Sequence, residues 1–141
     1  MNKHHIDRLE KLYTFLGTVK PEKFNLCEWA VAGDNNKADV NACGTTACAM
    51  GWAGSMPEFR KRGLKLVWDK DENTGYVELV KRNGRKRYGG DAGAEFFGLT
   101  NDEANHLFIP WTTYEENMTL SQYRRRLRKF INRKKRTLGI K

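Results

Sequence analysis

The pattern of apolar and polar positions predicts an amphipathic helix at each end of the chain. Near the N-terminus, apolar side chains recur at spacings of three and four, which places them on one face of a helix over residues 7–16. Gly17 and Pro21 end this helix. A similar stripe begins near Thr119 or Ser121. The two stripes consist of Ile6, Leu9, Leu12, Tyr13 and Leu16, and of Leu120, Tyr123, Leu127, Phe130 and Ile131.

An uncharged stretch rich in small residues, over residues 43–54, predicts a central helix around which the rest of the chain packs. Thr45 or Thr46 can cap this helix, which runs to Ala53, and Gly54 limits its length. Small side chains let another backbone or a ligand approach closely. The free N–H groups and the dipole of a helix N-terminus attract anions. The stretch is therefore either a close-packed helix or an anion-binding site.

Two short helices are predicted before the C-terminal one. Asp91 can cap a helix over residues 92–97 that ends at Gly98. Thr100 and Glu103 have the spacing of a capping box and open the next helix.

Alternation of apolar and polar side chains predicts a β-hairpin. Residues 64–69 and 76–80 alternate with a period of two, and the turn-rich residues 70–75 connect them. Asn83–Gly84 favours a tight turn that leads into a third short strand ending at Tyr88. A two-stranded hairpin is marginal alone, so its apolar face should pack on the helices. We predict an α+β fold, with four to five helices around the central short helix and a β-hairpin or three-stranded antiparallel sheet.

The composition favours one intracellular domain. The 141 residues are enough for a single hydrophobic core. Three cysteines, an odd number, argue against a disulfide framework and for a reducing compartment. The chain has no apolar run of about 18 residues and no signal peptide. We therefore expect a cytoplasmic protein that does not contact a membrane.

The net charge of +9 is concentrated at the C-terminus. Residues 119–141 hold ten Lys or Arg and no acidic residue, whereas the other 118 residues hold 16 basic and 17 acidic side chains. We accordingly divide the chain into a compact α+β core, residues 1–118, and a basic C-terminal helix and tail, residues 119–141, packed on the same domain. Such a basic block is typical of proteins that bind phosphate-bearing partners, and also of solvated tails.

Cysteine and metal chemistry have little support in the sequence. Cys43 and Cys48 lack the second pair of ligands that a zinc site needs, so we expect small buried side chains. Cys43 close to a helix N-terminus, with His106 as its base, would suit a nucleophile, but nothing in the sequence brings the two together. A phosphate-binding loop motif is absent. Enzymatic activity stays open, a binding protein is favoured, and we expect no metal and no cofactor.

Three separated segments carry recognisable motifs. Residues 24–29 read Phe-Asn-Leu-Cys-Glu-Trp, and residues 43–53 read Cys-Gly-Thr-Thr-Ala-Cys-Ala-Met-Gly-Trp-Ala. Residues 92–108 contain Gly-Leu-Thr, then Glu-Ala and Leu-Phe. Together they resemble a family of small uncharacterised phage and bacterial proteins with a Cys-Gly-Thr-x-x-Cys-x-x-Gly-(Trp or His)-Ala signature. The resemblance implies a phage or bacterial origin and a common fold, and it implies no activity.

Our first functional hypothesis is a non-enzymatic, phage-type binding protein for a phosphate-bearing small molecule. Phages make small proteins that sequester nucleotide signals of host defence, so the resemblance suggests a counter-defence protein in the host cytoplasm. It would sequester a nucleotide signal or block a host defence protein. A homodimer that builds its site between subunits is left open. The residues expected to bind the ligand through N–H groups, hydroxyls, stacking and positive charge are Thr45, Thr46, Trp52, Arg85, Arg87 and Trp111.

The alternative hypothesis is a DNA- or RNA-binding protein that uses the basic C-terminal helix. Arginine presents a fork of donors that suits phosphate, and rows of Lys and Arg give salt-dependent, sequence-tolerant affinity. The chain carries no signature of a known nucleic-acid-binding module. The residues expected to make the contacts are Arg124, Arg125, Arg128, Lys129 and Arg133.

Overall fold

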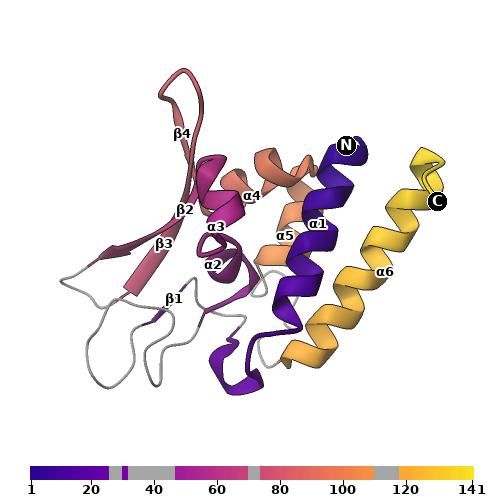
Figure 1. Ribbon diagram of the computed structural model, residues 1–141, viewed down its shortest axis with the longest axis horizontal. Coiled ribbons are helices and arrows are strands. Elements are labelled where there is room, and N and C mark those ends of the chain that lie inside the picture. The colour runs from indigo at the N-terminus through magenta and orange to yellow at the C-terminus, as the bar shows by residue number, and fades with distance from the viewer. Residues whose placement is uncertain (26–29, 32–46, 70–73, 110–117) are drawn as a thin grey trace.

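Helices cover one face of a small antiparallel sheet in the computed structural model of the chain, which describes residues 1–25, 30–31, 47–69, 74–109 and 118–141 (Figure 1). The sheet lies on one side, helices α2, α3 and α4 come next, and α6 is outermost on the far side. The predicted α+β class is confirmed. None of the described helices is long and apolar enough to span a membrane.

Six α-helices and one short 3₁₀ helix occur in the described ranges. The 3₁₀ helix η1 spans Pro21–Lys23. The α-helices are α1 (Lys3–Leu16), α2 (Ala49–Ala53), α3 (Pro57–Lys61), α4 (Gly89–Phe97), α5 (Asn101–Phe108) and α6 (Leu120–Leu138).

The sheet is built around strand β3 (Thr74–Val80). Every residue of β2 (Leu64–Asp69) pairs with β3, from Thr74 to Leu79. The opposite edge of β3 pairs with β4 (Lys86–Tyr88) at one end and with β1 (Ala30–Val31) at the other. All of these pairings are antiparallel. The predicted hairpin and the third strand ending at Tyr88 are therefore confirmed.

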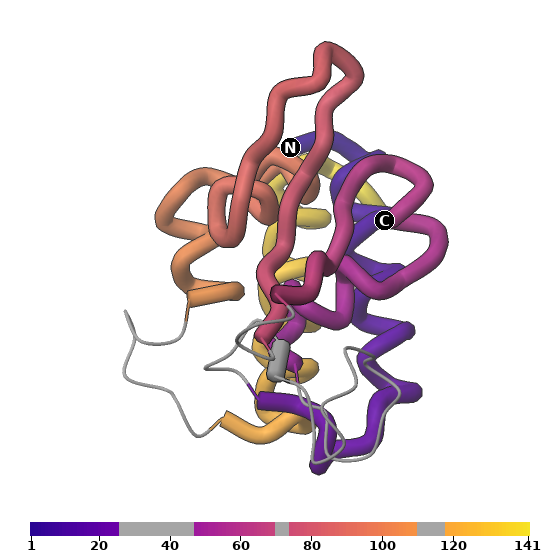
Figure 2. The backbone as a smooth tube through the Cα atoms, turned by 90° about the vertical axis from the view of Figure 1, so that its left-hand side faces the viewer, coloured from indigo at the N-terminus to yellow at the C-terminus, as the bar shows by residue number. Residues whose placement is uncertain are grey.

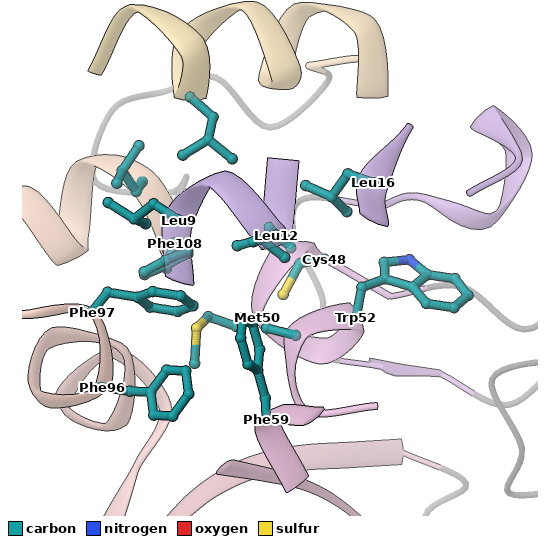
Figure 3. Packing of buried hydrophobic residues seen from close by; sticks show 14 of the residues in the cluster. Leu9, Leu12, Leu16, Cys48, Met50, Trp52, Phe59, Phe96, Phe97 and Phe108 are labelled. Carbon is teal, nitrogen blue, oxygen red and sulfur yellow. The ribbon is translucent and has the colours of Figure 1, made fainter. Parts of the chain in front are cut away.

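The apolar stripes of α1 and α6 are both buried, as their helical spacing predicts. Every residue of α2 is buried too, so the expected close-packed central helix is present. Figure 3 shows Met50 of α2 between α1 and a group of aromatic rings. These rings belong to Phe59, Phe96, Phe97 and Phe108, and successive ring centres lie 4.9–5.8 Å apart.

The predicted start of the central helix is wrong. Helix α2 begins at Ala49, and its N-cap, Cys48, makes no side-chain capping bond. Ala47 cannot join the helix because its backbone pairs with the segment around Phe24: its N–H donates to Lys23 O and its carbonyl accepts from Asn25 N, both at 3.0 Å. Ala47 to Met50 are all buried, so this helix start presents no exposed anion site. The predicted caps at Thr45 and Thr46 lie outside the described ranges.

Two other helices also begin earlier than predicted. Helix α1 starts at Lys3, where the Asn2 side chain accepts from His5 N at 3.1 Å and completes a capping box. Helix α4 starts at Gly89, since the positive φ of 53° at Gly89 lets β4 turn directly into the helix. The predicted end of α4 at Gly98 and the Thr100–Glu103 capping box are confirmed, and Gly98 has a left-handed conformation.

Candidate nucleic-acid interface

Helix α6 carries nine basic side chains and no acidic one, and it packs along α1 and beside α5. A capping box between Thr119 and Gln122 fixes its first turn. The apolar stripe of α6 is buried, so the basic residues of the helix lie elsewhere. Some lie on the two flanks that contact neighbouring helices, and the others lie on the outward face. These two groups have different partners.

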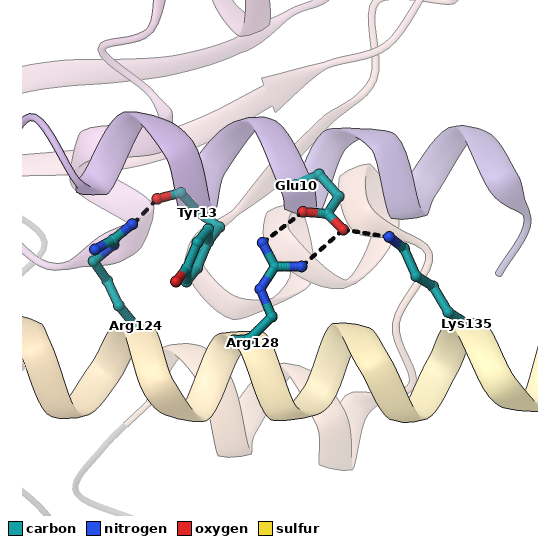
Figure 4. A network of polar contacts seen from close by, with 5 residues as sticks. All are labelled: Glu10, Tyr13, Arg124, Arg128 and Lys135. Carbon is teal, nitrogen blue, oxygen red and sulfur yellow. Dashed lines mark hydrogen bonds and ion pairs between the residues drawn. The ribbon is translucent and has the colours of Figure 1, made fainter. Parts of the chain in front are cut away.

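On the α1 flank, Glu10 binds two cations of α6 (Figure 4). The Arg128 guanidinium donates to both carboxylate oxygens of Glu10, at 2.9 and 2.8 Å, and Lys135 Nζ lies 2.6 Å from Glu10 Oε1. The hydrogen bond from Arg128, followed by that from Lys135, lowers the pKa of Glu10. Arg128 is therefore a docking residue that joins α6 to α1.

Tyr13 provides a second contact on this flank. Arg124 Nε donates to the Tyr13 carbonyl at 3.3 Å. The guanidinium carbons of Arg124 and Arg128 lie 4.2 and 4.1 Å from the centre of the Tyr13 ring. Both guanidinium groups therefore make cation–π contacts with the electron-rich face of the Tyr13 ring.

On the α5 flank, Lys134 forms an ion pair with Glu103, and Arg126 donates to the His106 carbonyl at 3.4 Å. Burial lowers the pKa of the His106 imidazole, and the charges of Arg126 and Arg133 lower it further. Both effects favour the neutral form of the imidazole beside the positive charge of α6.

The outward face of α6 carries the basic row, which we define as Arg125, Lys129, Arg133 and Arg136. Spacings of four, four and three place these residues on one face, and all four side chains are exposed. Within the described ranges no carboxylate pairs with any of them. Together with Gln122 and His106 the row lines an open groove of about 1010 Å³.

The structure separates the five predicted nucleic-acid-binding residues into two groups. Arg125, Lys129 and Arg133 lie on the outward face, whereas Arg124 and Arg128 dock on α1. Sequence reasoning missed Arg136, although its helical spacing from Arg125 and Lys129 was a usable signal. It also missed that His106 lines the same groove.

The residues predicted to bind a nucleotide do not form one described site. Trp52 is only 4% exposed, and its indole N–H donates to Lys23 O at 3.2 Å. Its ring is a core side chain that lies 6.2 Å from the Phe15 ring, rather than an open stacking surface. Arg85 and Arg87 belong to the projecting β3–β4 hairpin, and Arg87 Nε lies 3.5 Å from Glu95 of α4. Thr45, Thr46 and Trp111 lie outside the described ranges.

Cysteine chemistry has no described site. Cys48 is buried at the start of α2, whereas Cys27 and Cys43 fall in the ranges that the structure does not describe. Among the residues with described positions, no group of three or more His, Cys, Asp or Glu side chains could hold a metal ion.

Comparison of the sequence with protein-family models and with curated proteins finds no match, and comparison of the fold with solved structures finds none either. The functional argument therefore depends on the geometry and charge of the chain itself.

Proposed function

We propose that the protein binds nucleic acid through the basic row of α6. The observation that carries this proposal is the division of the basic residues on α6. Arg128, Lys134 and Lys135 are neutralised by Glu10 and Glu103, whereas the four cations of the basic row have no described acidic partner. The docked residues hold the helix in place, and the row presents its charge to solvent.

The spacing of the basic row suits a phosphate backbone. From Arg125 to Arg136 the helix rises about 16 Å, which is the axial length of about five phosphates on one strand of a duplex. Three of the four residues are arginines, whose planar guanidinium can bind two phosphate oxygens at once. Contacts of this kind position the protein on nucleic acid without reading its sequence.

The nucleotide-sequestering, counter-defence hypothesis stays a prediction with less support. Thr45, Thr46 and Trp111 lack described positions, and Trp52 belongs to the core. Native mass spectrometry of the protein purified from cells separates the two hypotheses. Discrete nucleotide-sized mass on the folded chain would favour sequestration, and heterogeneous polynucleotide removed by salt would favour the basic row.

The direct test is the salt dependence of binding to a labelled duplex, followed by fluorescence anisotropy. Four phosphate contacts predict a slope of log K against log salt of about −3.6. The double variant Lys129→Gln, Arg133→Gln removes two contacts, so its slope should be shallower by about 1.8. The affinity of this variant for the duplex at low salt should also be lower than that of the unaltered protein.

The matched control is the double variant Lys61→Gln, Arg62→Gln, which removes the same charge from exposed positions at the end of α3. This variant should keep the slope of the unaltered protein. An equal loss in both double variants would mean that net charge alone binds the duplex. An unchanged slope in the α6 variant would exclude the basic row as the site.

A further inference from the structure

The open face of the sheet carries an exposed aromatic pair on the side away from the helices. Tyr76 of β3 and Tyr88 of β4 are 41% and 55% exposed, and their ring centres lie 6.2 Å apart. Tyr88 pairs with Glu78, two residues along β3 from Tyr76, so both tyrosines point to the same face. The alternate residues Val77 and Leu79 are buried against the helices, so the tyrosines face solvent.

Basic side chains follow this pair along the β3–β4 hairpin. Residues 81–87, which comprise the turn after β3 and the first two residues of β4, contain five Lys or Arg and no acidic residue. Lys81 and Arg87 pair with Glu95 at 2.6 and 3.5 Å. Arg82 and Arg85, on either side of the turn, are exposed and have no ion pair with any described residue. Figure 2 shows that this hairpin projects beyond the helices.

We propose that this face binds single-stranded nucleic acid, with bases stacked on Tyr76 and Tyr88 and the backbone at Arg82 and Arg85. Exposed aromatic rings on a sheet stack with unpaired bases, because every base offers a flat π face. The bases of a duplex are already stacked on one another and cannot use the rings. The aromatic pair therefore selects single strands.

The chemistry of the surrounding face favours a polyanion over a protein partner. Lys65 of β2, Glu78 of β3 and Lys86 of β4 lie on the same face as the aromatic pair, by the register of the strands. Lys86 Nζ lies 3.7 Å from Glu78 Oε2, so Glu78 neutralises Lys86, whereas Lys65 has no ion pair with any described carboxylate. The hairpin turn adds Arg82 and Arg85. An apolar protein partner would leave these cations facing an apolar surface, whereas phosphates would neutralise them.

This site adds a second surface to the proposed function and uses none of the residues of the basic row. Figure 1 places the hairpin and α6 on opposite sides of the molecule. The two sites can therefore be tested separately. The basic row should bind duplex and single strand alike, and the aromatic pair should contribute to single-strand binding only.

The experiment measures the affinity for a labelled oligothymidylate of about ten nucleotides and for a duplex. Because the basic row also binds single strands, the oligothymidylate is titrated against chains that already carry Lys129→Gln and Arg133→Gln. In that background, adding Tyr76→Ala and Tyr88→Ala should lower single-strand affinity about tenfold or more. Duplex affinity should stay unchanged because no charge is removed. The control Tyr76→Phe, Tyr88→Phe keeps both rings and should retain single-strand affinity. Circular dichroism checks that both variants fold.

Photocrosslinking with oligonucleotides that contain 5-iodouracil gives an independent readout, and we expect crosslinks at Tyr76 or Tyr88. Unchanged single-strand affinity in the alanine variant would overturn the proposal and leave the aromatic pair as a protein contact. Crosslinks confined to α6 would overturn it as well. Neither result affects the basic row, whose failure is seen instead as unchanged duplex binding in the α6 variant.

Discussion

Glu10 is the residue at which two cations of α6 converge, so it links the charge of that helix to stability. We expect Glu10→Gln to lower the free energy of unfolding by about 1 kcal/mol at neutral pH, because charged hydrogen bonds to Arg128 and Lys135 are lost. Urea denaturation measures this difference. Glu22→Gln, which alters an exposed glutamate of η1, should have almost no effect.

The effect of Glu10 should depend on pH with a defined sign. The pKa of Glu10 is lowered in the folded protein, chiefly by the Arg128 hydrogen bond. The folded state therefore favours the ionised carboxylate more than the unfolded state does. The stabilisation is therefore complete above the unfolded pKa and disappears as the pH falls through the folded pKa. The difference between unaltered protein and Glu10→Gln should shrink below about pH 4. A difference that persists in acid would assign the effect to packing instead.

Gly63 and Gly84 form a matched pair for separating backbone strain from steric contact. Both have positive φ, 96° and 81°. A Cβ at Gly63 would collide with the Val80 carbonyl oxygen, whereas a Cβ at Gly84 would meet nothing within 4 Å. Gly84→Ala should lower the free energy of unfolding by about 1 kcal/mol, because alanine is strained in the left-handed conformation and meets no steric contact. Gly63→Ala should cost about 3 kcal/mol or more. Equal urea midpoints for the two variants would contradict the register of β2 and β3 in this region.

At the scale of elements, α6 is part of the core as well as a carrier of charge. Leu127 is fully buried, so Leu127→Ala should lower the free energy of unfolding by about 3 kcal/mol. Leu138 near the end of the same helix is 39% exposed, and Leu138→Ala should cost less than about 0.5 kcal/mol. Similar losses at both positions would contradict the docking of α6 on α1. Deleting the helix would unfold the protein, so charge substitutions test its function better.

The elements that could be predicted from the sequence are those with local causes. The stripes of α1 and α6 and the Thr100–Glu103 capping box depend on residues within a few positions of one another. The start of α2 could not be predicted in the same way. It is set by backbone bonds between Ala47 and the segment from Lys23 to Asn25, which is distant in sequence.

The sequence predicts that the candidate interface is basic, but it does not predict which of its basic residues stay exposed. The density of arginine and lysine on α6 is visible in the sequence, but the residues that stay exposed depend on Glu10 and Glu103 of other helices. Arg128 is neutralised for this reason, whereas Lys129 beside it is not. The aromatic pair was missed because it depends on the register between β3 and β4, which brings Tyr88 diagonally opposite Tyr76.

At the scale of the whole molecule, positive charge is exposed on two sides. The basic row lies on the outermost helix and the β3–β4 hairpin lies beyond the opposite face of the helical layer (Figures 1 and 2). The body between them holds acidic partners such as Glu10, Glu95 and Glu103, which neutralise the inward cations. Exposed cations without a described acidic partner therefore occur on two separate surfaces, although the net positive charge of the sequence comes from residues 119–141.

This division predicts how binding should change with the length of the strand. Two oligonucleotides of about ten nucleotides should bind one chain, one at the basic row and one at the aromatic pair, and native mass spectrometry counts them. The α6 double variant and the tyrosine double variant should each bind one, at the site left intact. A strand long enough to reach both surfaces should bind one to one and more tightly than either short strand, because its second contact becomes intramolecular. A single short strand per chain that both sets of substitutions weaken equally would mean that the two surfaces form one site.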